Sequence, residues 1–279
     1  WTFTYNMVYI TDPSGIWVER PDGRRDLYQK SGSVYTAPAG IYDELVEYQT
    51  GKFYLKTKED LRYYFDNTSH KRLTKMQDAN GNIINVAYND TLISTLTDGG
   101  GHSIGFTWSN ARLTEITDNS CSPVRKILYA YDSKGNPIKV TNPIGDFVNY
   151  KYDPTFKIIG YTDESGNNMS MVYNTNNAVT RITSCITTHL FSYLPQQLKT
   201  YVTEKVNGQS VVTAYSFDEQ GRVISKKGNC CGFNVDYVYD AKNNVSTLLD
   251  GNKKETKYLY DSKGNVIKAI DPVGNFVTY

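Results

Sequence analysis

Aromatic and other side chains alternate along much of the chain with a period of two. The stretches ILYAY (127–131), VNYKY (148–152) and KYLY (257–260) are examples. Because neighbouring residues of a strand point to opposite faces, each stretch predicts a strand with paired aromatic rings on one face. Gly and Pro interrupt the chain too often for helices of about 10 residues or more. The pattern therefore predicts an all-β protein.

The aromatic pattern recurs at a nearly constant spacing of about 21 residues. It consists of an aromatic residue, any residue, a second aromatic residue, and then Asp or Asn. Good copies occur at Tyr63-Phe65-Asp66, Tyr129-Tyr131-Asp132, Tyr150-Tyr152-Asp153, Tyr215-Phe217-Asp218, Tyr237-Tyr239-Asp240 and Tyr258-Tyr260-Asp261. Looser copies occur at Val86-Tyr88-Asn89, Phe106-Trp108-Ser109, Met171-Tyr173-Asn174 and Phe191-Tyr193-Leu194. The hexapeptide YDSKGN occurs twice, at 131–136 and 260–265, six repeats apart. The sequence predicts about ten tandem units.

Each unit has the features of a β-hairpin. The Asp after the second aromatic residue favours the first position of a type I turn, and Gly three residues later suits the left-handed position that closes such a hairpin. Lys or Arg then introduces a second strand, and a second turn such as NPIGD (142–146) or DPVGN (271–275) precedes the next aromatic strand. The structural residues of the repeat are predicted to be Tyr129, Tyr131, Asp132, Gly135, Tyr150, Tyr152, Asp153, Tyr215, Phe217, Asp218, Gly221, Tyr237, Tyr239, Asp240, Tyr258, Tyr260, Asp261 and Gly264.

A lone hairpin is only marginally stable in water, so the units are expected to pair edge to edge in one continuous sheet. The tyrosines would then lie on one face, in register from unit to unit. A β-propeller with two hairpins in each blade of about 43 residues shares this period, but it requires odd and even units to differ systematically. The units show little such alternation.

These residues resemble the YD repeats of the Rhs family, whose signature is Tyr-x-Tyr-Asp-x-x-Gly-(Arg/Asn) at a similar spacing. The resemblance covers residues 63–279, and residues 1–62, including RPDGRRDLYQKSGSVYTAPAG, resemble the β-rich lead-in to the repeats of bacterial members. It implies tandem hairpins in a curved, spiralling sheet that is part of a hollow shell. In bacterial members the shell encloses a C-terminal toxin domain, and in teneurin-like members a related shell supports cell adhesion.

The chain departs from the family at its last residues. In many bacterial members a core motif with self-cleaving aspartates continues beyond the DPxG stretch, whereas IDPVGNFVTY stops at Tyr279. Neither protease nor toxin activity is therefore expected, and Asp271 is expected to be a turn residue. We expect the chain to be a piece of a longer protein. Its last strand would leave an unpaired edge, through which copies could associate.

The composition of the chain argues against some classes of binding partner and indicates where the protein is located. The chain has 24 tyrosines, and its 30 Lys and Arg nearly balance 29 Asp and Glu. This balance argues against a nucleic-acid or anionic-membrane partner. No apolar run approaches the ~18 to 20 residues of a membrane span, and the N-terminal residues lack the features of a signal peptide. We expect a secreted or surface protein whose export signal lies outside these residues.

Metal and cofactor chemistry finds little support in the sequence. Cys121, Cys185, Cys230 and Cys231 form no CxxC pair, and His70, His102 and His189 are scattered. Zinc is therefore disfavoured, whereas a vicinal disulfide, a disulfide between repeats and free thiols all remain open. Turns rich in Asp, Asn and Gly match neither the EF-hand nor the β-roll calcium pattern. No cofactor is expected.

The sequence also lacks the hydrolase motifs GxSxG and HExxH, and its carboxylates recur at the same turn position in unit after unit. We therefore predict a non-enzymatic shell segment that encloses or presents a toxin-like polypeptide cargo. The alternative is an adhesion module that binds a protein or a glycan through exposed aromatic strand faces. Sequons at Asn67, Asn89, Asn168 and Asn244 matter only in a eukaryote that glycosylates.

Overall fold

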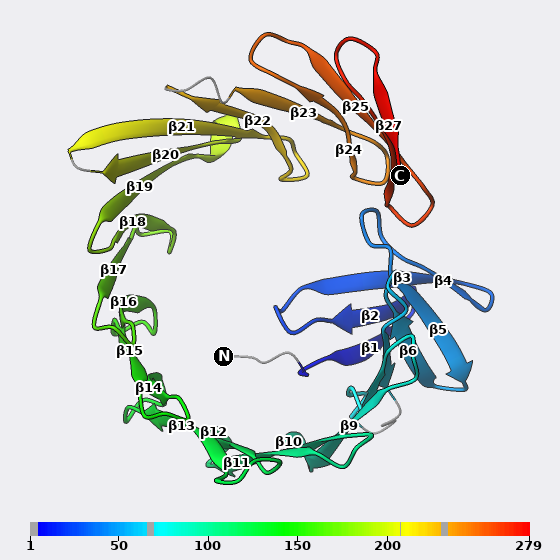
Figure 1. Cartoon of the computed structure of the whole chain (residues 1–279), viewed down its shortest axis with the longest axis vertical. Coiled ribbons are helices and arrows are strands. Elements are labelled where there is room, and N and C mark those ends of the chain that lie inside the picture. Colours follow the sequence, from blue (N-terminus) through cyan, green and yellow to red (C-terminus); the bar gives the residue numbers. More distant parts are fainter. Residues whose placement is uncertain (1–4, 66–69, 207, 230–233) are drawn as a thin grey trace. The chain divides into compact units, whose positions relative to one another are not determined.

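The computed structural model describes residues 5–65, 70–206, 208–229 and 234–279. The chain divides into two compact units, residues 1–128 (unit 1) and 129–279 (unit 2). In the described residues, the regular elements are strands and one short 3-10 helix, η1 (Pro195–Gln197) (Figure 1). The predicted all-β chain of tandem hairpins in a long antiparallel sheet is confirmed. The predicted domain boundary between residues 62 and 63 stays a prediction.

Unit 1 begins with a small antiparallel sheet, here called the N-terminal sheet. Its strands, paired in chain order, are β1 (Val8–Asp12), β2 (Gly15–Glu19), β3 (Arg25–Ser31) and β4 (Val34–Thr36). Gly15 is needed where β2 begins, because a Cβ atom at this position would lie 2.0 Å from the carbonyl oxygen of Tyr28. No other residue fits this approach of the two backbones.

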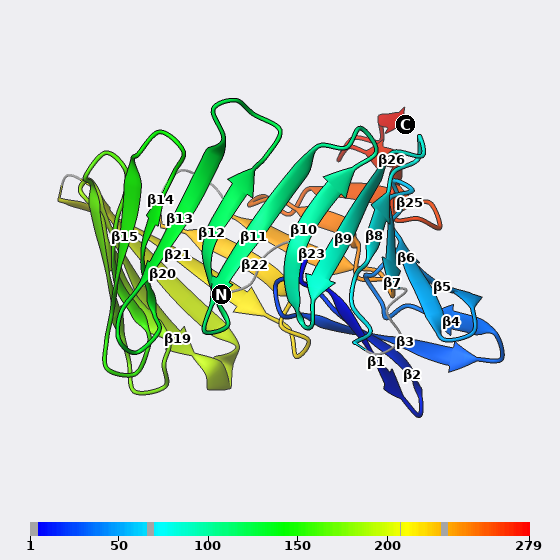
Figure 2. The same ribbon diagram turned by 90° about the horizontal axis from the view of Figure 1, so that it is seen from below.

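The rest of unit 1 is a second antiparallel sheet in which each strand pairs with the next. Figure 2 shows strands β9 to β12 side by side. The strands are β5 (Glu44–Gln49), β6 (Lys52–Lys56), β7 (Arg62–Phe65), β8 (Lys75–Gln77), β9 (Ile83–Asn89), β10 (Leu92–Asp98), β11 (Ser103–Ser109), β12 (Arg112–Asp118) and β13 (Arg125–Tyr131). The last of these strands continues into unit 2.

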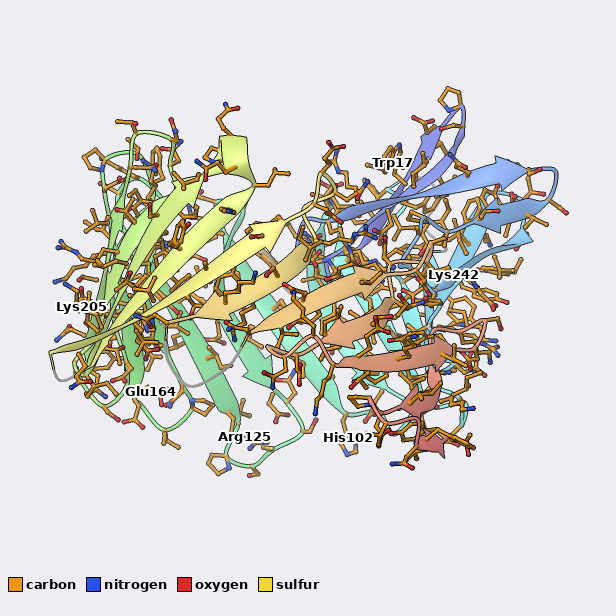
Figure 3. All side chains as sticks on the ribbon, turned by 90° about the horizontal axis from the view of Figure 1, so that it is seen from above. Trp17, His102, Arg125, Glu164, Lys205 and Lys242 are labelled. Carbon is orange, nitrogen blue, oxygen red and sulfur yellow. The ribbon has the colours of Figure 1, made fainter. Side chains whose placement is uncertain are left out.

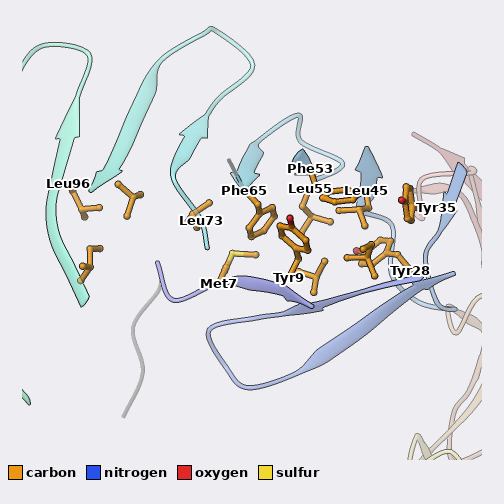
Figure 4. Close-up of a cluster of buried hydrophobic side chains, with 14 residues drawn as sticks. Met7, Tyr9, Tyr28, Tyr35, Leu45, Phe53, Leu55, Phe65, Leu73 and Leu96 are labelled. Carbon is orange, nitrogen blue, oxygen red and sulfur yellow. The ribbon is translucent and has the colours of Figure 1, made fainter. Parts of the chain in front are cut away.

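The hydrophobic core of unit 1 lies between its two sheets (Figure 4). The Tyr9 ring meets the Phe53 ring edge to face, with 4.9 Å between centroids. Leu55 and Phe65 are completely buried. Full burial of such a side chain contributes roughly 1.5–3 kcal/mol. The buried members of the core are Met7, Tyr9, Ile16, Val18, Tyr28, Tyr35, Leu45, Phe53, Leu55, Phe65, Leu73, Val86, Ile93 and Leu96.

An ion network joins the N-terminal sheet to the segment that precedes β5. The Arg20 guanidinium contacts Asp26 Oδ2 and Asp43 Oδ2, each at 2.7 Å. The Asp26 side chain is only 6% exposed, and the Arg20 cation compensates this buried carboxylate, while Asp43 is a second anionic partner of the same guanidinium.

Unit 2 continues the antiparallel pairing in a single layer. Its strands are the end of β13 and then β14 (Pro137–Thr141), β15 (Phe147–Tyr152), β16 (Ile158–Thr162), β17 (Asn168–Tyr173), β18 (Val179–Thr183), β19 (Thr187–Leu194), β20 (Lys199–Val206), β21 (Gln209–Phe217), β22 (Val223–Gly228), β23 (Val235–Tyr239), β24 (Val245–Leu249), β25 (Glu255–Tyr260), β26 (Val266–Ile270) and β27 (Phe276–Thr278). Among the described residues of unit 2, only Asn136, Pro137 and Gly160 are buried. Unit 2 therefore needs another source of stability than a hydrophobic core.

Candidate functional site: the tyrosine face and its turns

The strand register places the aromatic side chains at the two repeat positions of unit 2 on one face of its sheet, here called the tyrosine face, whereas Phe147, Tyr201 and Phe276 lie on the opposite face. Tyr150 is paired with Tyr161, and their ring centroids lie 5.5 Å apart. Apart from Tyr193, which is exposed, the rings at the repeat positions are half-buried, whereas residues between them, such as Val238 and Leu259, are exposed on the opposite face. The first aromatic position of a repeat is held by Tyr129, Tyr150, Phe191, Tyr215, Tyr237 and Tyr258, and the second by Tyr131, Tyr152, Tyr173, Tyr193, Phe217, Tyr239 and Tyr260.

The Asp side chain of the first turn holds the loop that follows it. Asp132 Oδ1 accepts the N–H groups of Lys134 at 2.9 Å and Asn136 at 2.8 Å, while Asn136 Nδ2 donates to Asp132 Oδ2 at 2.8 Å. Gly135 has φ +88°, in the left-handed region. The hydrogen bonds from the side chain and backbone of Asn136 lower the pKa of Asp132. The loops of Asp153, Asp218, Asp240 and Asp261 share the two backbone bonds to Oδ1, and Gly221 and Gly264 also have positive φ.

The second turn of the hairpin was predicted from the sequence. That it contains the same loop as the first turn was not predicted. Asp163 Oδ1 accepts the N–H groups of Ser165 and Asn167, at 2.9 and 2.8 Å. Asn142 replaces the carboxylate with an amide oxygen and accepts two N–H groups in the same way. Asp271 likewise accepts two N–H groups in its turn. The same five-residue loop thus occurs at both ends of hairpins in unit 2, although not in every turn.

The second aromatic position bonds to the preceding hairpin. Tyr152 pairs with Ile158 and Lys151 pairs with Gly160, so Ile159 is an unpaired bulge residue. The Tyr173 hydroxyl, from the next hairpin, donates to the carbonyl oxygen of Ile158 at 2.8 Å. The hydroxyl therefore satisfies a carbonyl beside the bulge and joins two neighbouring hairpins.

This bond, here called the tyrosine lock, recurs along both units. Burial raises the pKa of Tyr88 to about 12, so its hydroxyl keeps the donated proton at neutral pH. At one position the indole N–H of Trp108 replaces the hydroxyl. The other locks join Tyr88 to Leu73 (2.7 Å), Tyr152 to Pro137 (3.0 Å), Tyr193 to Val179 (2.7 Å), Tyr239 to Val223 (2.7 Å) and Tyr260 to Val245 (2.7 Å).

Phe217 holds the second aromatic position of its repeat but has no hydroxyl to form a tyrosine lock. The hairpin before it, β19–β20, pairs without a register shift and is closed by η1 instead of the Asp loop. The carbonyl oxygen of Leu198 at its end accepts the backbone N–H of Phe217 at 2.8 Å. Phe217 therefore has no hydroxyl where the preceding hairpin pairs without a register shift, although Tyr88 does donate to Leu73 of β7–β8, whose described residues also pair without one.

Side chains at the ends of the hairpins also bond to their neighbours. Arg222 Nη1 donates to Asn243 Oδ1 of the next first turn at 2.6 Å, and its guanidinium lies 4.6 Å from the centre of the Tyr239 ring. On the second-turn edge, Asn142 Nδ2 donates to Glu164 Oε1 at 2.9 Å. Glu164 is labelled in Figure 3. Successive hairpins are thus joined at their ends as well as along their strands.

Cys121, His102 and Arg125 line a pocket of about 380 Å³. Figure 3 labels His102 and Arg125. The Cys121 thiol donates to Asp118 Oδ2 at 3.2 Å. Hydrogen bonds from the Ser120 backbone and from Cys121 and Arg125 lower the pKa of Asp118 to about 2. The carboxylate therefore remains an acceptor that holds the turn.

The structure describes two of the four cysteines. Cys121 and Cys185 are free thiols. Cys230, Cys231 and the repeat residue Asp66 lie outside the described residues. Within the described ranges, no group of three or more His, Cys, Asp or Glu side chains could hold a metal ion.

Comparisons with known proteins agree with this architecture. The crystal structure of TcdB2-TccC3-Cdc42 is similar with a TM-score of 0.56 and 12% identity, over 97% of this chain and 19% of that one. The crystal structure of TcdB2-TccC3 is similar with a TM-score of 0.55 and 12% identity, over 97% of this chain and 19% of that chain. The crystal structure of TcdB2-TccC3 without its hypervariable C-terminal region has a TM-score of 0.55 and 13% identity, over 97% of this chain and 18% of that chain. This chain spans about a fifth of those chains, and the likeness shows a shared fold. No curated protein matches the sequence.

The family assignment comes from the sequence. The Teneurin YD-shell family matches residues 125–277, more than half of the chain, and this range contains most of the tyrosine locks and Asp loops described above. The resemblance to Rhs/YD-repeat proteins is thereby confirmed. The chain belongs to the Teneurin YD-shell family.

Proposed function

We propose that this chain is a non-enzymatic wall segment of a secreted or surface-exposed YD shell, which encloses or presents a polypeptide cargo. The observation that carries the proposal is the tyrosine lock, because it joins each hairpin to the one before it and is repeated along the sheet. Such a device extends a wall by adding hairpins, without a second layer of structure in unit 2.

The family and the solved structures support the same proposal. The family is a shell family, and the similar structures are of TcdB2-TccC3 assemblies. No helix in the described part of the chain is long and apolar enough to cross a membrane. A toxin-like cargo is the class that the Rhs resemblance implies.

Protease protection tests the proposal. A labelled, unfolded polypeptide is mixed with the purified chain during refolding, and its digestion is followed after excess polypeptide is removed. We expect the retained polypeptide to be digested more slowly than the free polypeptide. Equal digestion rates, or a hydrolase activity that one substitution abolishes, would contradict a non-enzymatic enclosing wall.

Adhesion is the second candidate, because unit 2 also exposes apolar side chains on the face opposite its tyrosines. Val238 and Leu259 are 48% and 49% exposed there, on strands β23 and β25. Adhesion through this face predicts that Val238→Ser and Leu259→Ser weaken cell or glycan binding. The enclosing function predicts that the same substitutions leave protease protection unchanged.

A further inference from the structure

We propose that the two aromatic positions of the repeat have different roles. The second position holds the wall together, and the first position, in unit 2, contacts extended, apolar segments of the polypeptide cargo. This inference rests on the proposed function and names the surface and the side chains that the cargo contacts.

In unit 1, the corresponding face of the second sheet is covered, and its cover shows which kind of structure suits such a face. The register of that sheet pairs Leu55 with Tyr63 and Phe53 with Phe65, which places these four residues on the face that carries the aromatic pair. The N-terminal sheet covers them with extended strands, and Tyr9 of β1 packs against both phenylalanine rings. The corresponding face of the second sheet of unit 1, which carries Tyr63 and Phe65, is therefore a surface that binds β-strands of polypeptide.

First-position residues take part in that covered surface. Tyr63 and Phe106 are partly buried and pack against the core, and Val86 is a buried member of it. The first position thus supplies side chains to the core beneath the covering sheet in unit 1, where second-position Phe65 also packs against Tyr9.

In unit 2, no described residue of the unit forms a second layer on the tyrosine face. The first and second aromatic positions of the repeat also differ in their hydrogen bonds. Second-position hydroxyls such as Tyr239 and Tyr260 are bound to carbonyl oxygens of the preceding hairpin. Among the described residues, none accepts a hydrogen bond from the hydroxyls of Tyr129, Tyr237 or Tyr258. A rigid apolar ring with a donor at its tip suits a polypeptide, whose backbone supplies carbonyl acceptors.

The two faces of the unit 2 sheet differ in the number of charged side chains that they carry. By strand register, only Glu204 and Lys226 among its described strand residues place a charge on the tyrosine face. The opposite face carries Lys139, Lys151, Arg181, Lys199, Lys205, Lys227, Asp236, Glu255, Lys257 and Lys268. Charged side chains remain on surfaces that contact water, so the tyrosine face is the one suited to an apolar occupant.

Fluorescence anisotropy with an unfolded probe tests this assignment. The probe is fluorescein-labelled α-lactalbumin, kept unfolded by reduction and carboxymethylation. We expect the triple variant Tyr129→Ser, Tyr237→Ser, Tyr258→Ser to bind at least tenfold more weakly than the unchanged chain. The matched variant Val172→Ser, Val238→Ser, Leu259→Ser alters the opposite face and is expected to bind with unchanged affinity.

A second variant set separates binding from stability. Tyr152→Phe, Tyr239→Phe, Tyr260→Phe removes three lock hydroxyls and keeps the rings, so we expect a lower melting temperature with unchanged probe affinity. If the serine variant does not fold, a photocrosslinking side chain in place of Tyr237 or of Val238 answers the question. Crosslinking to the probe is expected at position 237, and crosslinking at 238 alone would overturn the assignment.

The remaining outcomes distinguish this inference from the proposed function. If the unchanged chain binds the probe and the first-position serines leave affinity intact, the assignment is wrong and an enclosing wall stands. If the unchanged chain does not bind the probe at all, both the role assigned to the first position and the proposed enclosing function are wrong. Binding of cello- or chito-oligosaccharides that the first-position serines abolish, without probe binding, would identify the tyrosine face as a glycan site instead.

Discussion

The two units stabilise β-hairpins of the same type in different ways. Unit 1 packs the N-terminal sheet against β5–β10 and buries a core that includes Leu55 and Phe65. Unit 2 has a single layer, and its hairpins depend on Asp loops, bulges and tyrosine locks. A hydrophobic core distributes stability over many contacts, whereas the interactions of unit 2 join nearest neighbours. In this chain, hairpins that repeat the lock and the loop therefore form a single layer in unit 2.

The same substitution in the two units gives the largest expected contrast. Leu55 is completely buried, so Leu55→Ala is expected to lower the free energy of unfolding by about 3 kcal/mol. Leu259 is 49% exposed on a strand of unit 2, and Leu259→Ala is expected to cost at most about 0.5 kcal/mol. Urea unfolding followed by circular dichroism measures both values. Equal losses would mean that unit 2 is also stabilised by a core.

Acid is expected to weaken the loops of unit 2 one by one. The pKa of Asp132 and of Asp261 is lowered, first by the side-chain hydrogen bond from the Asn four residues on. Since the folded pKa lies below the unfolded one, these loops add stability above the ordinary Asp pKa of about 3.9, and this stability is lost as the pH falls through the folded pKa. Amide chemical shifts of Lys134 and Asn136, measured by NMR from pH 7 to 2, are expected to titrate below the ordinary value.

The chain contains its own control for this titration. Asn174 occupies the same loop position with an amide oxygen, which accepts the N–H groups of Asn176 and Ala178, each at 3.0 Å. Because an amide does not titrate, the shifts of these two amides are expected to stay constant while Asp132 is protonated. Parallel titration in both loops would indicate global unfolding and would remove the local explanation.

How far the sequence predicts these features depends on how local they are. The alternation of Tyr129 and Tyr131 and the spacing of Asp132 and Gly135 depend on adjacent residues, so they predicted the hairpin and its turn. The lock joins Tyr173 to Ile158, and neither its acceptor nor the bulge at Ile159 has a sequence signal of its own. The cover that the N-terminal sheet places on unit 1 is equally a matter of tertiary packing, so residues 1–62 predicted only a β-rich lead-in.

Removing one lock is expected to have a smaller effect than removing a core side chain. Tyr239→Phe keeps the ring but leaves the carbonyl of Val223 without its hydroxyl donor, at 2.7 Å in the structure. The expected loss is about 1 kcal/mol, the usual value of one hydrogen bond. Thermal melting of the variant measures it. Phe217→Tyr is the matched control, and no gain is expected there because the Leu198 carbonyl already accepts the backbone N–H of residue 217.

The smallest expected effect has the opposite sign and concerns a single loop residue. Phe156 occupies the turn position that Gly135 holds in the preceding hairpin, with φ +68°, and its side chain is 59% exposed. A non-glycine residue in this conformation is strained by roughly 1–2 kcal/mol, while glycine loses more backbone entropy on folding. Phe156→Gly is therefore expected to stabilise the chain by about 0.5–1 kcal/mol, whereas Gly135→Phe is expected to destabilise it. Melting temperatures of both variants test the pair. A loss of stability in Phe156→Gly would show that this ring contributes packing to the single layer of unit 2, and would narrow the difference between the two units.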